Sequence, residues 1–488
     1  MKIVKTVLLA LLLLTVLGTL AEDYPASLFG IRSDGITLNT RSIQYGIDYI
    51  NKKGGGRLVF SVGRYVTGSI HLKSNVTLEL EEGAVLLGSL NPFDYDRQIF
   101  TALIFADNQH NIAITGKGII DGQGGQVAAN LVNLIHSGIV KDPLRKDRPA
   151  EAIRPMLINF TSCENVIVRK ITLKNAASWV ETYDQCKKVV LDSLTVDSRS
   201  YWNNDGIDIV DCDSVKVTHC YIDAADDGIC LKSHDSTKGC QDILLSHNTI
   251  RSSANAIKFG TASYGGFSHI HILNTRVFDT YRSALALEAV DGGIIDDVVV
   301  DSLEVHHTGN AVFLRIGERV SGRKSQLSNV QISNLSAEIA ADKADSGYSY
   351  EGPVEDQPRN VSPAIIITGL PGSFISDVTL KNITIRNPGG GNSFFAKVLL
   401  NELDKVPEKP FSYPDFSMFG ELPAWGIYIR HAKNILLNNL QLSCSRKDYR
   451  VAIVLDDVHQ ASLLSMAIKA RDNKKTVYLN NSTEIKTK

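Results

Sequence analysis

One short segment recurs along the middle of this chain and limits the folds it can adopt. The segment alternates aliphatic and other residues and then ends at a polar position. Its copies start at Val166, Val189, Val215, Ile243, Ile270, Val298, Val330, Val378 and Ile435. Such alternation indicates strands with one buried face. A period of about 25 residues with two or three short strands predicts a parallel β-helix, in which each turn of the chain stacks on the last.

Two other all-β folds could carry such alternation, a β-sandwich and a β-propeller. Propeller blades need longer and more even periods of about 40 residues. The first five intervals here are 23, 26, 28, 27 and 28 residues. We therefore predict an all-β chain that forms a right-handed parallel β-helix.

The later intervals of 32, 48 and 57 residues predict loops inserted between coils, near 341–363 and 387–426. Long loops on a rigid scaffold are more often functional than idle. The second loop is rich in aromatic residues, namely Phe411, Tyr413, Phe416, Phe419 and Trp425.

A polar residue recurs four positions after each start of the repeat. We expect these residues to stack at one turn and to hydrogen-bond to the next coil. They are Ser193, His219, His247, Asn274, Ser302, Asn334, Asn382 and Asn439, with Lys170 as the departure in the first coil.

The chain has seven cysteines, an odd number, so at least one is unpaired. Four of the seven recur just before new strands, which fits stacked turn positions better than a disulfide framework. These four are Cys163, Cys186, Cys212 and Cys240.

The N-terminus predicts export and then a cap. Residues 1–21 combine two lysines, an apolar stretch too short to span a bilayer and small residues before Ala21, so we expect a signal peptide cleaved after Ala21. We expect the mature protein in the periplasm or outside the cell, as one β-helix domain over 22–488. Residues 40–52 read as an amphipathic helix that ends at three glycines, and an open solenoid end needs such a cap.

Composition narrows the partners. The formal net charge of the 488 residues is −2, which gives no reason to expect nucleic acid or an anionic membrane as a partner. The sequence has no HExxH, paired CxxC or calcium-loop pattern, so we expect neither a bound metal nor a cofactor. We expect a monomer that acts on a polysaccharide or oligosaccharide.

Four aspartates in two neighbouring coils are the strongest chemical signal. Asp205 and Asp208 lie in one copy of a carboxylate-glycine-aliphatic pattern, and Asp226 and Asp227 lie in the next. Stacked strands lie about 4.8 Å apart, so Asp205 and Asp227 should be neighbours. Like charges that close raise at least one pKa, as a general acid requires. The alternative, that these are turn aspartates capping backbone amides, suits two adjacent acids poorly.

Aligning the alternation of these coils predicts which residues share a column. The inward column contains Ile207, Ile229, Ile257, Leu285 and Val312. Two residues earlier stand Asp205, Asp227, Asn255, Ser283 and Asn310. One outward column contains Asp208, Cys230, Lys258, Ala286 and Phe313, and the next contains Val210, Lys232, Gly260, Glu288 and Arg315. Acidic residues therefore gather on two coils beside polar and basic residues on the following ones.

These motifs resemble glycoside hydrolase family 28, the polygalacturonase family. Residues 203–206 read Asn-Asn-Asp-Gly and are similar to the family's Asn-Thr-Asp-Gly, and the Asp-Asp pair follows at the family's spacing. The resemblance implies hydrolysis in one step with inversion at the anomeric carbon. It also implies that Asp226 is the general acid and that Asp205 and Asp227 hold and activate the water.

The chain departs from the family at two motifs. Asn255 stands where the family has the histidine of Gly-His-Gly, and Ala286 and Glu288 replace the Arg and Lys that bind the substrate carboxylate. Lys258, Arg282 or Arg315 could supply a replacement cation. Because Glu288 should repel an anionic sugar, we expect weak cleavage of plain homogalacturonan and better cleavage of a branched or mixed pectic glycan. The expected substrate-binding residues are Asn203, Asp208, Asn255, Lys258, Arg282, Glu288 and Arg315.

Three functions remain open from the sequence. The first is an exported inverting hydrolase of a pectic or related polysaccharide. The second is a lyase on the same fold, with calcium on the aspartates and Arg282 as the base. The third is a noncatalytic β-helix that binds glycans. Trp179, one turn before the first acidic coil, reads equally well as a core residue and as a platform for a sugar ring.

Overall fold

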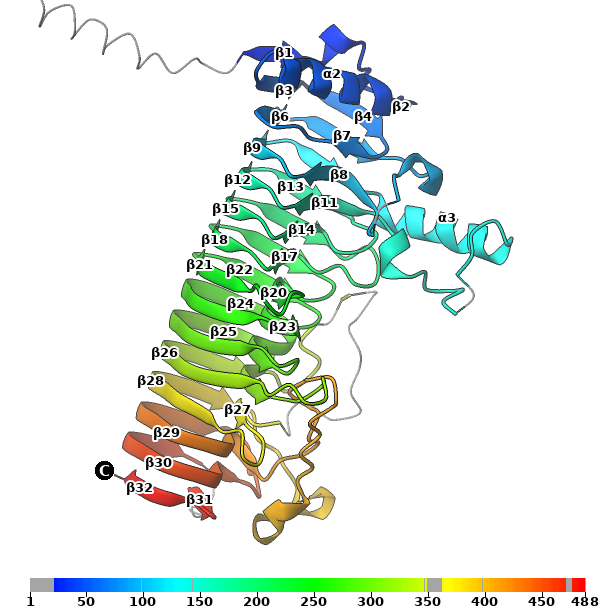
Figure 1. Cartoon of the computed structure of the whole chain (residues 1–488). Coiled ribbons are helices and arrows are strands. Elements are labelled where there is room, and N and C mark those ends of the chain that lie inside the picture. The colour runs from blue at the N-terminus through cyan, green and yellow to red at the C-terminus, as the bar shows by residue number, and fades with distance from the viewer. Residues whose placement is uncertain are drawn as a thin grey trace, which may run out of the picture.

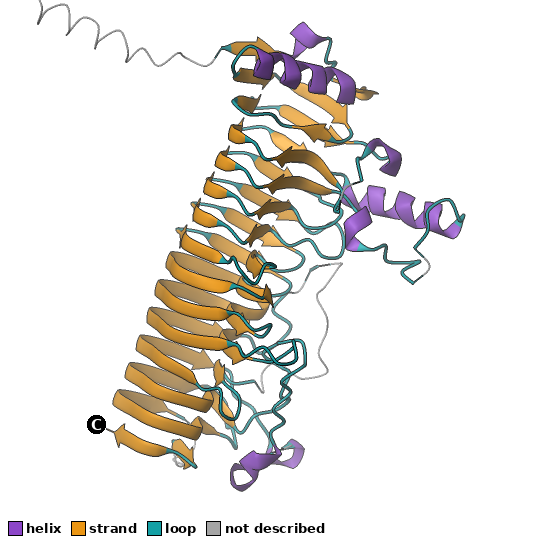
Figure 2. Ribbon diagram, viewed as in Figure 1, coloured by secondary structure: helices purple, strands orange, loops and turns teal. Residues whose placement is uncertain are grey.

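The computed structural model describes residues 22–97, 99–142, 144–345, 347–348, 362–396, 398–470 and 476–487. The strands of this part form one solenoid in which each coil adds a strand to each of three parallel ladders (Figure 1). The fold is the predicted right-handed parallel β-helix. Figure 2 shows one helix lying over the first coils, whereas the other long helix and most of the longer loops lie along one side of the stack.

The three ladders run the length of the solenoid and share its longest strands. The first ladder contains β1 (Asp23–Pro25), β3 (Gly56–Phe60), β6 (Val76–Leu80), β9 (His110–Gly116), β12 (Glu164–Arg169), β15 (Lys187–Asp192), β18 (Asp213–Thr218), β21 (Cys240–Ser246) and β32 (Thr483–Thr487). The second contains β2 (Asp34–Leu38), β4 (Gly63–Thr67), β7 (Ala84–Gly88), β10 (Ile119–Asp121), β13 (Thr172–Lys174), β16 (Thr195–Ser198), β19 (Tyr221–Ala224) and β22 (Thr249–Ser252).

The third ladder, which we call the site sheet, carries the acidic residues. It contains β5 (Ile70–His71), β8 (Ala102–Asp107), β11 (Met156–Thr161), β14 (Glu181–Asp184), β17 (Ile207–Val210), β20 (Ile229–Ser233), β23 (Ile257–Ser263), β27 (Ile365–Thr368) and β31 (Val477–Asn480). Long bent strands serve more than one ladder, namely β24 (Gly266–Ala289), β25 (Ile294–Ile316), β26 (Gln326–Ile339), β28 (Ile375–Asn387), β29 (Ala424–Cys444) and β30 (Val451–Lys469). The helices are α2 (Thr40–Lys52), α3 (Gly124–His136) and the short 3-10 turns Ala26–Phe29, Pro92–Asp94, Glu151–Ile153, Ser393–Phe395 and Leu400–Lys405.

The repeat read from the sequence is the true register of the first ladder. All nine predicted starts pair in succession, from Val166 with Val189 to Val378 with Ile435. The solenoid also extends beyond them, since Ile112 pairs with Val166 and Ala461 pairs with Ile435. The pattern missed these coils because Gly116 stands at the polar position of the first and Ala461 is a small residue at the start of the second.

The recurring polar residues form one column, which we call the turn column. All of its members, Lys170 included, have φ between 48° and 61°, a left-handed conformation that asparagine tolerates well. The amide of Asn382 donates to Asn334 Oδ1 at 2.9 Å, and the amide of Asn439 donates to Asn382 Oδ1 at 2.9 Å. The predicted hydrogen bonds between coils are therefore confirmed here.

The cysteines behave as predicted. All seven are buried and unpaired. The backbone N–H of Cys163 lies 3.4 Å from Cys186 Sγ, and that of Cys186 lies 3.3 Å from Cys212 Sγ. Stacked thiols thus line one turn of successive coils.

The N-terminal cap is confirmed, because α2 spans residues 40–52 and buries Ile43, Ile47 and Ile50 against the first coils. The expected signal peptide, 1–21, lies outside the described residues. Among the described helices, none combines the length and the apolar character that crossing a bilayer requires.

The two expected inserts contribute differently. Most of 341–363 lies outside the described residues, but Tyr348 packs back against an earlier coil and donates to Asp223 Oδ1 at 2.6 Å. The second insert covers the outer face of the later coils. Its side chains Phe416, Met418 and Leu422 form an apolar cluster with outward residues of the site sheet, namely Ala286, Phe313, Ile366, Tyr428 and Val454.

Candidate active site

The predicted acids stand at the entrance to two adjacent strands of the site sheet. Asp205 precedes β17 and Asp227 precedes β20, each separated from its strand by one glycine. A Cβ on Gly206 would lie 2.5 Å from the carbonyl oxygen of Gly228, and a Cβ on Gly228 would lie 2.6 Å from that of Ala256. The glycine of each motif therefore allows the coils to approach closely enough for the carboxylates to stack.

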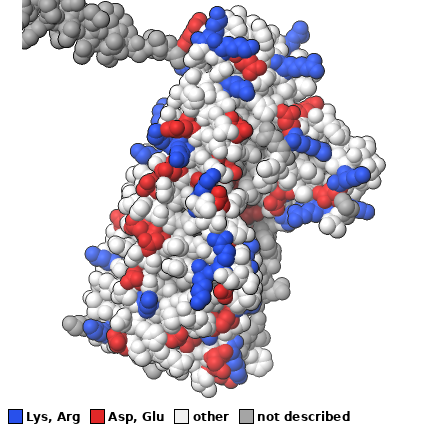
Figure 3. All heavy atoms as spheres, in the orientation of Figure 1, with Lys and Arg blue, Asp and Glu red and all other residues white. Residues whose placement is uncertain are grey.

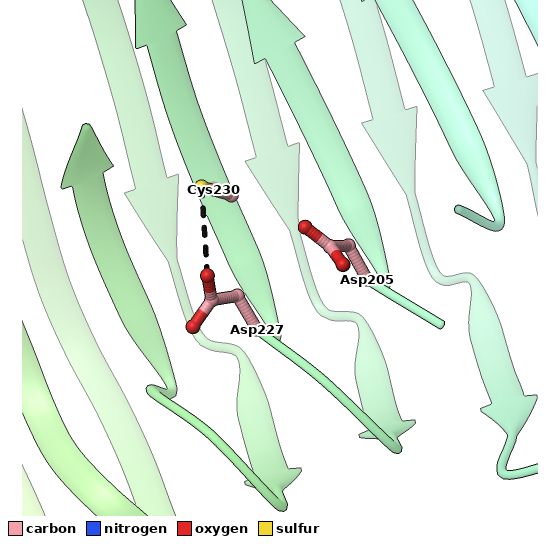
Figure 4. Close-up of side chains that lie close together, drawn as sticks. All are labelled: Asp205, Asp227 and Cys230. Carbon is pink, nitrogen blue, oxygen red and sulfur yellow. Dashed lines mark hydrogen bonds between the residues drawn. The ribbon is translucent and has the colours of Figure 1, made fainter. Parts of the chain in front are cut away.

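The stacking brings the acids together (Figure 4). One oxygen of Asp205, one of Asp227 and the sulfur of Cys230 all lie within 4.8 Å of one another. Asp205 is 5% exposed and Asp227 4%, whereas Asp226 is partly open to solvent. The structure thus brings the three predicted catalytic aspartates to one place.

Asp227 is held in its charged form. Lys258 Nζ lies 2.9 Å from its Oδ2, and the backbone and side-chain N–H groups of Asn255 donate to its Oδ1 at 3.0 and 2.9 Å. Burial alone would raise the pKa of this carboxyl, but Lys258, Lys232 and Arg282 outweigh burial and hold the pKa at about 2. Asp227 is therefore a carboxylate at any working pH.

Asp226 behaves in the opposite way. Burial raises its pKa most, and the negative charges of Asp205 and Asp227 raise it further, to about 7. Neighbouring carboxyl groups in one chain thus have pKa values on either side of the ordinary value. A proton donor and a proton acceptor in one site need pKa values separated in this way.

Lys232 connects the remaining acids. Its ammonium lies 3.0 Å from Asp205 Oδ2 and 2.5 Å from Asp208 Oδ1, and 4.4 Å from the centre of the Trp179 ring. Burial raises the pKa of both carboxyls, only partly offset by Lys232. Asp208 is fully buried, so the structure places this expected substrate contact beneath the site as a partner of Lys232. The column alignment places Lys232 in the outward column next to that of Asp208, so the sequence pattern already indicates that these two side chains lie close together.

The second insert reaches into the site through Tyr413. Lys258 donates to the Tyr413 hydroxyl at 2.6 Å, and half of the Tyr413 side chain is exposed. Two residues further on, Asp415 Oδ2 lies 3.0 Å from Arg282 Nε, and both side chains are buried. The insert therefore forms a wall beside the acids on the side of the later coils.

Three expectations from the column alignment need correction. Arg315 does not face the groove, because its guanidinium donates to the carbonyl oxygens of Gly369 and Glu408 at 3.1 and 2.6 Å and is 1% exposed. Lys232 does not pair with Gly260, because a bulge shifts the register and Ser233 pairs with Ser263. Bulges add residues without changing the alternation on either side.

The third correction concerns Glu288. This side chain is 1% exposed, and burial raises its pKa to about 8, so the group is mainly protonated at neutral pH. The expected repulsion of an anionic sugar required a charged and accessible carboxylate. Glu288 has neither property in this structure.

Asn203 lies on the turn before Asp205 and is held from behind. Arg154, which is fully buried, donates to Asn203 Oδ1 at 2.7 Å and to the carbonyl oxygens of Ala177 and Trp202 at 2.6 Å each. No pattern in the sequence predicts a role for Arg154, which precedes Asp205 by two coils. The neighbouring amide of Asn204 is buried in the turn itself and donates to the carbonyl oxygen of Ser178 at 2.8 Å.

The Asp205, Asp227 and Cys230 group is the one cluster of potential metal ligands among the described residues. Its fit to calcium is poor. An ammonium already lies within 3.0 Å of each carboxylate, and a thiol is a soft ligand that calcium does not prefer. Burial alone would lower the pKa of Arg282, but Asp415 outweighs burial and raises it, which does not favour Arg282 as the base of a lyase. The residues present therefore fit acid–base chemistry better than a calcium site.

Comparison with known proteins agrees with this geometry. The sequence model of the glycosyl hydrolases family 28 matches residues 60–253. The protein named "Probable polygalacturonase" from Vitis vinifera is 25% identical over 396 residues, 73% of each chain. The exo-poly-alpha-D-galacturonosidase of Dickeya chrysanthemi is 27% identical over 315 residues, 54% of this chain and about half (52%) of that enzyme.

A solved structure supports the fold. The family 28 exopolygalacturonase of Yersinia enterocolitica superposes with a TM-score of 0.65 over 96% of this chain and 78% of that one, at 19% identity. The family model and these relatives support membership of the chain in glycosyl hydrolases family 28. The chain is a glycoside hydrolase, and the lyase and noncatalytic alternatives are not favoured.

Proposed function

We propose that this chain hydrolyses a glycosidic bond of a pectic polysaccharide in a single displacement that inverts the anomeric carbon. The observation that supports this proposal most strongly is the difference between the pKa values of two neighbouring carboxyl groups, about 7 for Asp226 and about 2 for Asp227. An inverting hydrolase needs such a pair, one group protonated and the other ionised.

Asp226 gives its proton to the glycosidic oxygen as the bond to the anomeric carbon breaks. A water held between Asp205 and Asp227 attacks that carbon from the opposite face, and Asp227 accepts the proton that the water loses. Lys232 and Lys258 keep both water-binding carboxyl groups in place, since each ammonium lies within 3.0 Å of one of them.

The substrate class rests on the relatives and on the charge balance of the groove. The matched proteins are named for polygalacturonase activity, which supports a galacturonate-containing chain. The Arg and Lys that bind the substrate carboxylate in the family are replaced by Ala286 and Glu288 here. The loss of these two cations, with no repulsion from the buried Glu288, supports a mixed pectic glycan over plain homogalacturonan. The wall formed by Tyr413 and Asp415 supports action near chain ends.

We also propose export and a single domain. Export rests on the N-terminal sequence, and its test is the N-terminal residue of the mature protein after cell fractionation. A mature chain that begins at Glu22 supports it, whereas an intact Met1 in the cytoplasmic fraction contradicts it. The domain proposal, 22–488, rests on the unbroken pairing of coils in the described residues.

The test of the function is product analysis on homogalacturonan, rhamnogalacturonan and their oligosaccharides. Proton NMR of the first products should show the anomer opposite to the cleaved linkage. The Asp226→Asn variant should yield no product over the same period. Retained stereochemistry, or an unsaturated product absorbing in the ultraviolet, would overturn the proposed mechanism.

A further inference from the structure

The buried cations around the acids already have anionic partners. Lys232 contacts Asp205 and Asp208, Lys258 contacts Asp227, and Arg282 contacts Asp415. A sugar carboxylate that entered here would have to displace one of these buried partners. A substrate built from uronic acids therefore needs a cation from another element.

Arg148 is the exposed arginine that borders the turn leading to Asp205. Its Nη2 donates to Asn203 Oδ1 at 2.9 Å, and its guanidinium lies 4.4 Å from the centre of the Trp202 ring. Within the described parts of the chain, no carboxylate oxygen lies within ion-pair distance of this side chain. A guanidinium has five N–H donors, and stacking on an aromatic face leaves its edge able to bind a carboxylate with two parallel hydrogen bonds.

Basic residues outnumber acidic ones around Arg148. It belongs to the loop that follows α3, where Lys141, Arg145 and Lys146 are also exposed and where the acids Asp142 and Asp147 lie. Figure 1 shows α3 and this loop projecting from the solenoid at the level of β11 and β14, and Figure 3 shows Lys and Arg side chains gathered on the projection. Positive charge on the rim attracts an anionic chain before it binds.

A role in supporting the turn before Asp205 does not explain why Arg148 lies against Asn203. The buried Arg154 already donates to the same Asn203 oxygen at 2.7 Å and fixes the turn through the carbonyl oxygen of Trp202. An exposed second arginine adds little to that support, since its partner is already satisfied. Its remaining donors point to recognition of something outside the chain.

We propose that Arg148, stacked on Trp202, binds the carboxylate of a uronic acid unit next to the cleaved bond and thereby selects acidic glycans. It takes over a task that the missing Arg-Ile-Lys motif would perform, from the loop that follows α3. This inference rests on the proposed hydrolase function. Arg148 is a specificity-determining residue and takes no part in proton transfer.

The test compares Arg148→Gln with Arg145→Gln, which removes the same charge three residues away without touching Asn203 or Trp202. Substrates are galacturonate-containing oligosaccharides of defined length and the same compounds with their carboxyl groups reduced to alcohols. Arg148→Gln should raise KM on the acidic series at least about tenfold, as expected for a lost charge-assisted hydrogen bond, with little change in kcat. It should leave the reduced series unchanged. Arg145→Gln removes only long-range attraction, so it should change KM on the acidic series far less than Arg148→Gln does and leave the reduced series unchanged.

A binding measurement separates this inference from the proposed function. Calorimetry with Asp226→Asn and with the double variant Asp226→Asn, Arg148→Gln reports affinity without turnover. A loss of affinity for the acidic series alone in the double variant supports the role of Arg148, even if the assignment of the acid is wrong. Equal affinity of the two proteins for the acidic series, or no binding of that series by either, would overturn the inference.

Discussion

Two columns of polar residues run along this solenoid, and the same stacking gives them opposite properties. In the turn column, asparagine amides donate to one another across coils at 2.9 Å. In the site sheet, Asp205 and Asp227 stack at a similar spacing, within 4.8 Å. Amides can satisfy each other because each carries donors and acceptors, whereas ionised carboxylates carry acceptors only.

The comparison shows how a repeat can hold a reactive site. The coil spacing is fixed by backbone pairing, so carboxylates at stacked positions cannot move apart. The ammonium groups of Lys232 and Lys258 relieve the repulsion at Asp205 and Asp227, and a retained proton relieves it at Asp226. The site therefore combines a strong acid and a weak acid at adjacent residues.

The largest expected effect comes from removing the weak acid. Asp226→Asn should lower kcat by about 10²–10⁴-fold, since general acid assistance is lost while the shape of the side chain is kept. Steady-state kinetics on the preferred pectic oligosaccharide measure it. Asp213→Asn, a turn acid on another ladder, is the control and should keep full activity. Near-normal turnover by Asp226→Asn would break the contrast between the columns.

The next effect concerns the ammonium beside the strong acid. Lys258→Met removes the group 2.9 Å from Asp227, so the pKa of Asp227 should rise from about 2. The acidic limb of the kcat/KM profile should move up by about one to three pH units. An acidic limb identical to that of the parent would show that Lys258 does not keep Asp227 ionised.

A smaller effect is expected on stability. The folded-state pKa of Asp226, about 7, exceeds its ordinary 3.8, so the folded chain binds more protons between these values and loses stability as pH rises through that window. Above pH 7 the ionised side chain remains a destabilising charge. Asp226→Asn should therefore raise the thermal midpoint by a few degrees at pH 8 and much less at pH 4. An equal shift at both pH values would contradict the raised pKa.

The smallest effect belongs to the turn column. Asn382→Ala removes an amide that bridges two coils and places alanine at a φ of 56°, so stability should fall by about 1–2 kcal/mol. Chemical denaturation measures the loss, with the exposed neighbour Lys381→Ala as the control. Activity should stay unchanged, and a large loss of turnover would show that the two columns are not independent.

Periodicity predicted what backbone pairing fixes. The register of nine coils, the cap at residues 40–52 and the meeting of Asp205 with Asp227 all follow from alternation and a constant coil spacing. These features depend on local pattern, so a single sequence contains them.

Periodicity failed where the chain leaves the coil. A bulge after Gly260 shifts the register, so Gly260 does not pair with Lys232 as predicted. Arg315 and Asn203 contact residues from loops at distant positions in the chain, which the repeat does not predict. Tyr413 reaches Lys258 across 155 residues, a contact that no local pattern encodes. Burial likewise removed the expected charge of Glu288, because its side chain is only 1% exposed and alternation alone does not report how deeply a column is buried.

The central claim is that stacking splits the carboxyl pKa values of the site, and the pH dependence of kcat/KM on an acidic pectic oligosaccharide tests it most directly. This quantity reports the ionisations of the free enzyme, here the apparent values of the coupled acids. Activity should fall with an alkaline limb near pH 7, where Asp226 loses its proton, and it should persist well below pH 4 while Asp227 stays ionised. Full activity maintained above pH 9, or an acidic limb near the ordinary aspartate value, would contradict the account.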